Sequence, residues 1–249
     1  MKKLSDFHTI RSANTEFIKR VSYLTFIEVD DGEYDILGDV DFAYSGLSSL
    51  LEVTALLKEL ISSEVPVRIR RVQGSFDCSN NYLKDIKGAP ERVERNFNCN
   101  SNLLETLEGA PEYVGGHFLC EKNNLKNLTG APQYIGKDFY CSGNQLVSLE
   151  GAPQYVGGSF DCSENQLVSL AGAPRRIEKR FVCSFNKLQT LQGAPEYVGG
   201  NFVCVFNRLI SLEGAPKYVG GEFSCYGNTK KFTEEEVKKL VNIKDRVWT

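Results

Sequence analysis

Apolar residues return at fixed offsets along most of this chain. In a typical unit, Cys follows Phe by two residues, Asn follows Cys by three, and Leu stands five and eight residues after Cys, before Gly-Ala-Pro. Neighbouring units are 21 residues apart, and the interval is constant for the cysteines: Cys78, Cys99, Cys120, Cys141, Cys162, Cys183, Cys204 and Cys225. A repeat of this length is typical of a solenoid built from stacked coils.

Each unit predicts one short strand followed by a turn. Phe and Cys at positions i and i+2 point to the same face of a strand, so strands stacked in register give a parallel sheet with both side chains inside. The Asn amide can satisfy backbone groups that the turn leaves unpaired. Gly-Ala-Pro and the Gly-Gly that often follows are poor helix formers, which predicts an irregular, non-helical convex side.

The N-terminal part departs from the repeat. Residues 1–37 are expected to form a cap of short helices and a hairpin around Asp30-Asp31-Gly32. Residues 38–50 fit a degenerate first repeat. Residues 51–64 have the apolar spacing of an amphipathic helix, which predicts a helix inserted on the back or edge of the first coil.

The C-terminal part should close the other end of the stack. In residues 229–249, Thr233 and Glu236 form a capping-box pattern ahead of an apolar helical spacing, and a strand-like tail follows. The solenoid itself would then span residues 38–228, with helix and strand elements capping both ends, since the ends of a solenoid must be covered.

The repeat also resembles known families. The run L-x-L-x-x-N-x-L-x-x-L is the core of leucine-rich repeats, and here Phe and Cys stand at its first two Leu positions. Pro-x-x-Val before the strand is similar to bacterial LPX-type repeats, with one more residue per unit. Arrays such as residues 148–158, S-L-E-G-A-P-Q-Y-V-G-G, resemble the leucine-rich-repeat-like proteins of tailed bacteriophages. The resemblance covers about residues 34–249 and implies a leucine-rich-repeat-like fold and a phage or prophage source, but no known activity.

Composition narrows the function classes. The chain has 249 residues, 11% aromatic residues and a formal net charge of −3, which argues against disorder and against a generic nucleic-acid binder. No apolar stretch approaches the roughly 18 residues of a membrane helix. The N-terminus lacks the apolar segment of a signal peptide, so we expect a cytoplasmic protein, in the host bacterial cytoplasm if it is phage-encoded. In that compartment the core cysteines should be free thiols.

Outward-pointing positions of the predicted sheet form the candidate binding surface. On this concave face the N-terminal half is polar, whereas the C-terminal half carries a cluster of apolar side chains, which indicates a partner. The candidate partner-binding residues are Leu119, Tyr140, Val182, Phe185, Val203, Val205, Phe206 and Tyr226. The alternative is that the C-terminal cap folds over the cluster, through Phe232 or Trp248.

Two repeats replace the usual Tyr-Val-Gly-Gly with arginine-rich segments. The resulting basic edge could contact nucleic acid or an acidic protein, although interspersed Glu residues are typical of plain solvated charge. Its residues are Arg92, Arg95, Arg175, Arg176 and Arg180. The tyrosines of the other repeats are expected to pack as a ladder rather than to form a base-stacking platform.

Catalysis receives little support from the sequence. The chain has two histidines, no phosphate-binding loop and no metalloprotease or dinucleotide motif. His117, Glu121 and Asp138 could imitate an acid–base or metal cluster, but scattered polar residues on a polar face are mostly coincidental. We therefore expect no enzyme, with no catalytic residues, no metal and no cofactor.

These observations predict a non-enzymatic protein-binding module. If the resemblance to phage proteins holds, the partner is a bacterial host protein, such as a defence component that the chain binds and inhibits through its concave face. Two other functions remain open, a nucleic-acid or nucleotide-binding decoy that uses the arginine edge, and a structural or virion-associated protein.

Overall fold

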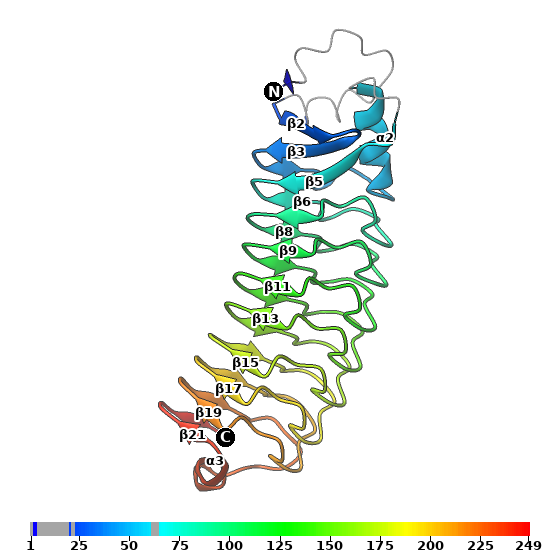
Figure 1. The fold of residues 1–249 in the computed structure, drawn as a ribbon. Helices are drawn as coiled ribbons and strands as arrows, with labels where there is room; N and C mark the ends of the chain where they lie inside the picture. Colours follow the sequence, from blue (N-terminus) through cyan, green and yellow to red (C-terminus); the bar gives the residue numbers. More distant parts are fainter. Residues whose placement is uncertain (1, 4–19, 21–22, 61–64) are drawn as a thin grey trace.

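The chain forms a parallel β-solenoid, as the repeat predicts. The computed structural model describes residues 2–3, 20, 23–60 and 65–249. Successive coils stack into one elongated body, with an N-terminal hairpin at one end and helix α3 (Glu234–Leu240) at the other (Figure 1). The convex side is irregular, which confirms the expected fold class.

Each regular coil contributes two short strands, so the prediction of one strand per repeat is wrong. The strand at Phe joins a ten-stranded sheet, here called the Phe sheet, in which adjacent strands run parallel. Its members are β4 (Val40–Asp41), β6 (Phe76–Asp77), β8 (Phe97–Asn98), β10 (Phe118–Leu119), β12 (Phe139–Tyr140), β14 (Phe160–Asp161), β16 (Phe181–Val182), β18 (Phe202–Val203), β20 (Phe223–Ser224) and β22 (Val247–Trp248).

The second strand of each coil follows Gly-Ala-Pro and builds what we call the Tyr side. One part is the end of an eight-stranded sheet that begins with the N-terminal hairpin, and its strands are β1 (Lys2–Lys3), β2 (Thr25–Asp30), β3 (Glu33–Leu37), β5 (Arg68–Val72), β7 (Arg92–Val93), β9 (Tyr113–Val114), β11 (Tyr134–Ile135) and β13 (Tyr155–Val156). The other part is a four-stranded sheet of β15 (Arg176–Ile177), β17 (Tyr197–Val198), β19 (Tyr218–Val219) and β21 (Asn242–Ile243).

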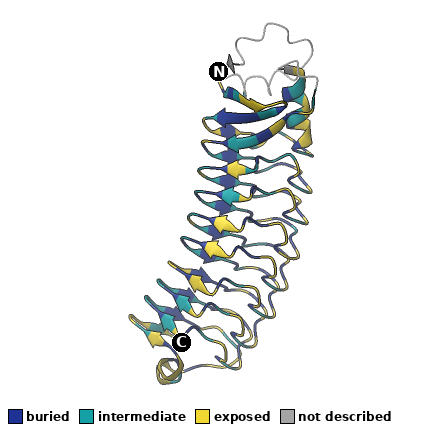
Figure 2. Ribbon diagram, in the orientation of Figure 1, coloured by how far each residue is buried: buried dark blue, intermediate teal, exposed yellow. Residues whose placement is uncertain are grey.

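The core is a set of ladders running along the stack. Phe rings from Phe42 to Phe223 lie 5.0–6.0 Å apart between neighbouring coils, measured between centroids. The Cys and Leu positions of each coil are buried beside them. Figure 2 shows buried residues repeating along the whole stack. Burying one Phe side chain contributes about 1.5–3 kcal/mol. Because each ring is buried against the rings of the neighbouring coils, stability comes from the contact of each coil with its neighbours.

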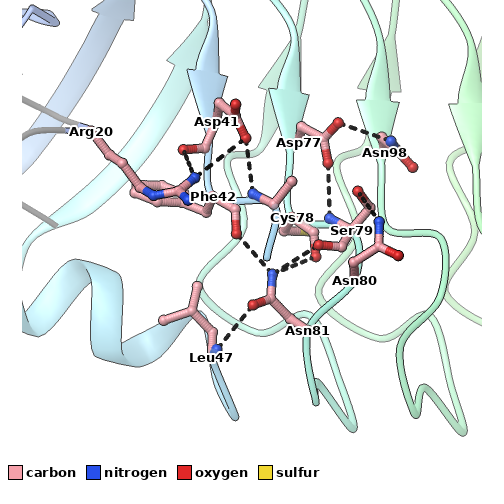
Figure 3. Close-up of polar contacts among 11 residues, drawn as sticks. Arg20, Asp41, Phe42, Leu47, Asp77, Cys78, Ser79, Asn80, Asn81 and Asn98 are labelled. Carbon is pink, nitrogen blue, oxygen red and sulfur yellow. Dashed lines mark hydrogen bonds and ion pairs between the residues drawn. The ribbon is translucent and has the colours of Figure 1, made fainter. Parts of the chain in front are cut away.

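The buried Asn of each coil ties three stretches of backbone together. In Figure 3, Nδ2 of Asn81 donates to the carbonyl oxygens of Phe42 (2.8 Å) and Cys78 (3.0 Å), and Oδ1 accepts from the backbone N–H of Leu47 (3.0 Å). The same pattern recurs at Asn102 and in every later coil to Asn228. The Asn side chain therefore satisfies the turn in its own coil and links it to the preceding one, as the sequence predicts.

The eight cysteines are free and buried. From Cys99 to Cys204, each thiol donates to a backbone carbonyl of the next coil, as the Sγ of Cys120 does to the carbonyl oxygen of Tyr140 at 3.4 Å. Burial raises the pKa of these thiols well above the ordinary value, and the pKa of Cys225 rises to about 11. The cysteines therefore act as small core residues, and their thiolates are disfavoured at neutral pH.

The described part of the N-terminal region contains a hairpin and one helix. Strands β2 and β3 pair antiparallel around Gly32, which has φ of +74°. The inserted helix is α2 (Leu51–Leu60), and Glu52 accepts backbone N–H bonds from Ser48 and Ser49 at its start. Residues 61–64 of the predicted helix, and most of residues 1–21, lie outside the described residues. Helix α2 lies at the back of the N-terminal coils, on the side of the loops (Figure 1), and its Val53 and Leu57 are buried in the core.

The Tyr side is interrupted between β13 and β15, while the Phe sheet is continuous. At most other coil junctions the N–H of a glycine bonds to the preceding coil, as from Gly157 to the carbonyl oxygen of Ile135 at 2.9 Å. Within residues 65–249, no such backbone bond joins Glu178 to Val156. A Cβ placed on the glycine of the other coils would collide with the preceding backbone carbonyl. Glu178 carries a Cβ at this position within the run of glycine-containing coils, whereas Gln73, Glu94 and Lys244 carry one near the ends of the stack and still make the bond.

Candidate functional site

The outer face of the Phe sheet carries the predicted binding columns. The residue three positions before each Cys is largely structural, because its side chain accepts the backbone N–H of the equivalent residue in the next coil. Asn96 accepts from His117 at 3.0 Å, and Asp138 accepts from Ser159 at 2.7 Å. Among the described residues, this series of bonds lapses on both sides of Arg180, next to the opening in the Tyr side.

The N-terminal half of this face is a polar surface whose groups bond to one another. Asn98 donates to Asp77 (2.9 Å), Asn100 donates to Glu121 (3.0 Å), and Ser142 donates to the other oxygen of Glu121 (2.8 Å). Because these donors and acceptors already have partners, the polar half resembles a self-contained network rather than an open ligand site.

Leu119 and Tyr140 lie within this polar half. They are cross-strand neighbours on β10 and β12, and both are partly buried. The hydroxyl of Tyr140 donates to Asp138 (3.1 Å), and burial together with the Asp138 carboxylate raises the pKa of the Tyr140 phenol. Asp161 stands between Tyr140 and Val182 in the sheet. The structure therefore separates these two predicted residues from the other six.

The other predicted residues come together in the C-terminal half. Val182 and Val203 are in register on β16 and β18, and Val205 is buried next to them. At the exit of these strands, the rings of Phe185 and Phe206 stack with centroids 4.8 Å apart. Tyr226 meets Phe206 edge-on at 5.4 Å.

We call Phe185, Phe206 and Tyr226 the aromatic row. Their side chains are about half exposed, at 52%, 46% and 45%. Contiguous apolar surface of this kind on a soluble face is typical of a contact site.

The backbone of the aromatic row is unfavourable for the side chains it carries. Phe185 and Phe206 have φ of +55° and +53°, in the left-handed region. This turn is left-handed throughout the repeat. Asn80 in the first regular coil and Gly143 in the fourth adopt the conformation readily, and the other coils hold it with Ser101, Lys122 and Glu164. A bulky side chain there costs on the order of 1 kcal/mol or more. The fold alone does not favour Phe at these two positions.

The C-terminal cap does not cover the aromatic row. Phe232 is buried in the core. Strand β22 adds to the Phe sheet with Trp248 in register with Ser224, and Trp248 is itself 46% exposed. Trp248 therefore extends the apolar end of the face instead of closing it. The sequence missed this role because only the pairing of the tail with β20 reveals it.

The basic edge lies on the Tyr side, and two of its arginines are neutralised. Arg92 pairs with Glu94 (2.7 Å) and lies 3.6 Å from the centroid of the Tyr113 ring. Arg176 pairs with Glu178 (2.5 Å) and lies 3.8 Å from the centroid of the Tyr197 ring. These arginines lower the pKa of both glutamates.

The remaining basic-edge residues, Arg95, Arg175 and Arg180, are exposed. They do not gather into one patch, because Arg95 belongs to the second regular coil, Arg175 starts the Tyr-side segment of the sixth, and Arg180 leads into the Phe sheet. A nucleic-acid site on this edge would have to use scattered charges.

The tyrosines of the Tyr side form packed ladders. Tyr113, Tyr134 and Tyr155 stack at 4.9 Å per step, and Tyr197 stacks on Tyr218 at the same distance. Arg176 interrupts the series at the opening of the sheet. Since their faces contact one another, these rings do not offer a free platform for bases.

The polar residues considered for catalysis are only partly together. His117 lies 3.0 Å from Asp138, whereas Glu121 bonds to Asn100 and Ser142 instead. Among the described residues, no group of three or more His, Cys, Asp or Glu side chains is arranged to hold a metal ion. In the same part of the chain, no helix has both the length and the apolar character needed to span a membrane.

The architecture defines the class as a leucine-rich-repeat-like solenoid, a kind of scaffold that typically binds partners on its sheet face. No family model matches the chain, and no curated protein matches it. Among solved structures, YopM from Yersinia enterocolitica WA-314 is similar, with 20% sequence identity and a TM-score of 0.45. The match covers 76% of this chain and 42% of YopM, so the chain spans less than half the length of that protein.

Proposed function

We propose that this chain is a non-enzymatic module that binds a protein through the C-terminal half of its Phe sheet. The observation that carries the proposal is the aromatic row, in which two Phe side chains occupy left-handed turn positions and remain half exposed. Strained residues that the fold does not need are often retained for function. Aromatic side chains are also the usual anchors of protein interfaces.

The partner in this proposal is a bacterial protein. Support comes from the resemblance of the repeat to leucine-rich-repeat-like proteins of tailed bacteriophages. A phage-encoded binding module without catalytic groups would act by occupying a host protein, and a defence component is a target whose occupation benefits a phage. The expected consequence of binding is therefore inhibition of that host protein in the bacterial cytoplasm.

The test is affinity capture from bacterial cells with the wild-type chain and with the double variant Phe185→Asn, Phe206→Asn. Asn80 occupies the equivalent turn with the same φ as Phe185, so the variant should fold at least as well as the wild type. We expect one or more host proteins to bind the wild type and to be lost from the variant. Their activity should fall when purified wild-type chain is added.

The matched control is Tyr44→Asn. Tyr44 is an exposed aromatic residue with φ of +55° in the corresponding turn of the first coil, at the opposite end of the solenoid. This variant should retain the captured protein. Capture that is equal for all three chains, or that is lost equally from both variants, would contradict the proposal.

A further inference from the structure

The outer face of the Phe sheet is divided by charge as well as by polarity. From the first to the fifth regular coil, its acidic side chains are Asp77, Glu121, Asp138, Asp161 and Glu164, with Lys122 as the basic residue at the turn edge. In the later coils and the C-terminal tail, the same face and its turn edge carry Arg180, Lys187, Arg208 and Arg246, with Glu222 as the acidic residue. The aromatic row is therefore surrounded mainly by basic side chains.

The cations next to the aromatic row differ from those of the Tyr side. Lys187 and Arg208 follow Phe185 and Phe206 by two residues, and both are exposed. Lys187 donates to the amide oxygen of Gln166 (3.0 Å), and no carboxylate within residues 65–249 pairs with Lys187 or Arg208. On the Tyr side, by contrast, Arg92 and Arg176 are each paired with a glutamate. The positive charge at the aromatic row thus has no counter-charge of its own.

We infer that the partner segment docked on the aromatic row is an acidic peptide segment with apolar side chains. The inference rests on the proposed function and specifies the chemistry of the partner. The apolar side chains would cover Phe206, Tyr226 and Trp248, while carboxylates would approach Lys187 and Arg208. The acidic N-terminal half of the same face repels a segment of this charge, which fixes where along the solenoid the segment binds.

A single-stranded nucleic acid also combines negative charge with stacking, but the geometry favours a peptide. Base stacking requires an open ring face. Phe206 already packs against two rings, with Phe185 stacked on it at 4.8 Å and Tyr226 perpendicular to it at 5.4 Å. The phosphates of a nucleic acid that extends along this face would also be repelled by the carboxylates of Asp161 and Glu164.

The experiment is a selection from a displayed library of random dodecapeptides on the immobilised full-length chain. We expect enriched peptides to combine Asp or Glu with large apolar residues and to lose binding to Phe185→Asn, Phe206→Asn. The double variant Lys187→Glu, Arg208→Glu should weaken the synthesised peptides by at least about tenfold. Its control is Arg95→Glu, Arg175→Glu, which makes the same charge change on the Tyr side and should leave their affinity unchanged.

The outcomes separate this inference from the proposed function. Peptides that need the two Phe residues but lack acidic residues, or that tolerate Lys187→Glu, Arg208→Glu, overturn the inference and leave the proposed function standing. Failure of any peptide to enrich on the wild type over the Phe variant also overturns it. Binding of a labelled oligothymidine that is lost in Lys187→Glu, Arg208→Glu would assign the surface to nucleic acid and overturn both.

Discussion

The two halves of the solenoid share one coil design and differ on their surface. In both halves, the Phe, Cys, Leu and Asn positions are buried and make the same contacts with the next coil. On the outer face, the N-terminal half has polar side chains that bond to each other, while the C-terminal half has exposed rings and two cations, Lys187 and Arg208, that pair with no carboxylate within residues 65–249. The contrast teaches that the coil-to-coil contacts leave the outward positions free to vary, so the surface can specialise without changing the fold.

The division of the face coincides with a division of the backbone. The Tyr side opens between β13 and β15, and the stack changes direction in that region (Figure 1). The series of side-chain-to-backbone hydrogen bonds on the Phe sheet is interrupted at Arg180, which is in the same coil as Glu178. The aromatic row begins in this coil as well. The apolar half therefore belongs to a segment of the stack that is offset from the polar half.

Alkaline pH should have the largest effect on the free energy of unfolding, because it acts on the buried thiols that both halves share. The pKa of each buried thiol is raised, so the folded chain holds protons that the unfolded chain loses above about pH 8.5. Stability is therefore full below that pH and falls as the pH rises, by up to about 11 kcal/mol per pH unit when all the unfolded thiols are ionised. Urea unfolding as a function of pH measures this slope.

Two single variants sharpen the alkaline test. Cys120→Ala lies in the polar half and Cys183→Ala in the apolar half, and each should reduce the slope by about an eighth of its full value. A slope that is unchanged in either variant would show that the thiol in that half is not protected as its burial implies.

Core truncation should have the next largest effect. Phe118→Ala and Phe202→Ala remove the same buried ring from the polar and the apolar half, and each should lower the free energy of unfolding by about 3–5 kcal/mol. Chemical denaturation measures both values. A difference of more than about 2 kcal/mol between them would mean that the two halves do not share one type of core.

The smallest expected effect concerns the opening in the Tyr side. Glu178→Gly introduces the glycine that most other coils have at this position and should let the N–H of residue 178 bond to Val156, a gain of up to about 1 kcal/mol in the free energy of unfolding with a straighter stack. Urea unfolding and small-angle X-ray scattering measure the two changes.

Glu94→Gly is the matched control for this prediction. Glu94 already donates its N–H to the carbonyl oxygen of Val72 at 3.0 Å, against the longer strand β5, so glycine there has no bond to gain. Glu94→Gly also removes the partner of Arg92, as Glu178→Gly removes that of Arg176. Equal effects of the two substitutions would mean that the Cβ of Glu178 does not cause the opening.

The sequence predicts the parts of this fold that depend on burial within one repeat. Phe, Cys, Leu and Asn recur because each must fill the same place in every coil, and the period alone assigns them. The Tyr-side strands are missed because each has only two residues, in the three-residue stretch between Pro and Gly-Gly, which is too short for a strand signal. Their bonds become apparent only when the neighbouring coil is present.

The candidate site was predictable to the same limited extent. The place of Val182, Val203, Phe185 and Phe206 on the outer face follows from their offsets from Cys. The position of Trp248 does not, because it depends on the pairing of β22. Likewise, the left-handed turn that makes the two Phe residues unusual is visible only in the backbone.

The Asn-linked coils also give the molecule a constant spacing along its length. Every coil makes the same connections to the one before it, so a duplication or deletion of 21 residues in the gene preserves the joints on either side. Each such event would move the aromatic row relative to the acidic half in steps of about 4.8 Å. Gain or loss of one such repeat can therefore change the spacing of the two surfaces without any point mutation at either.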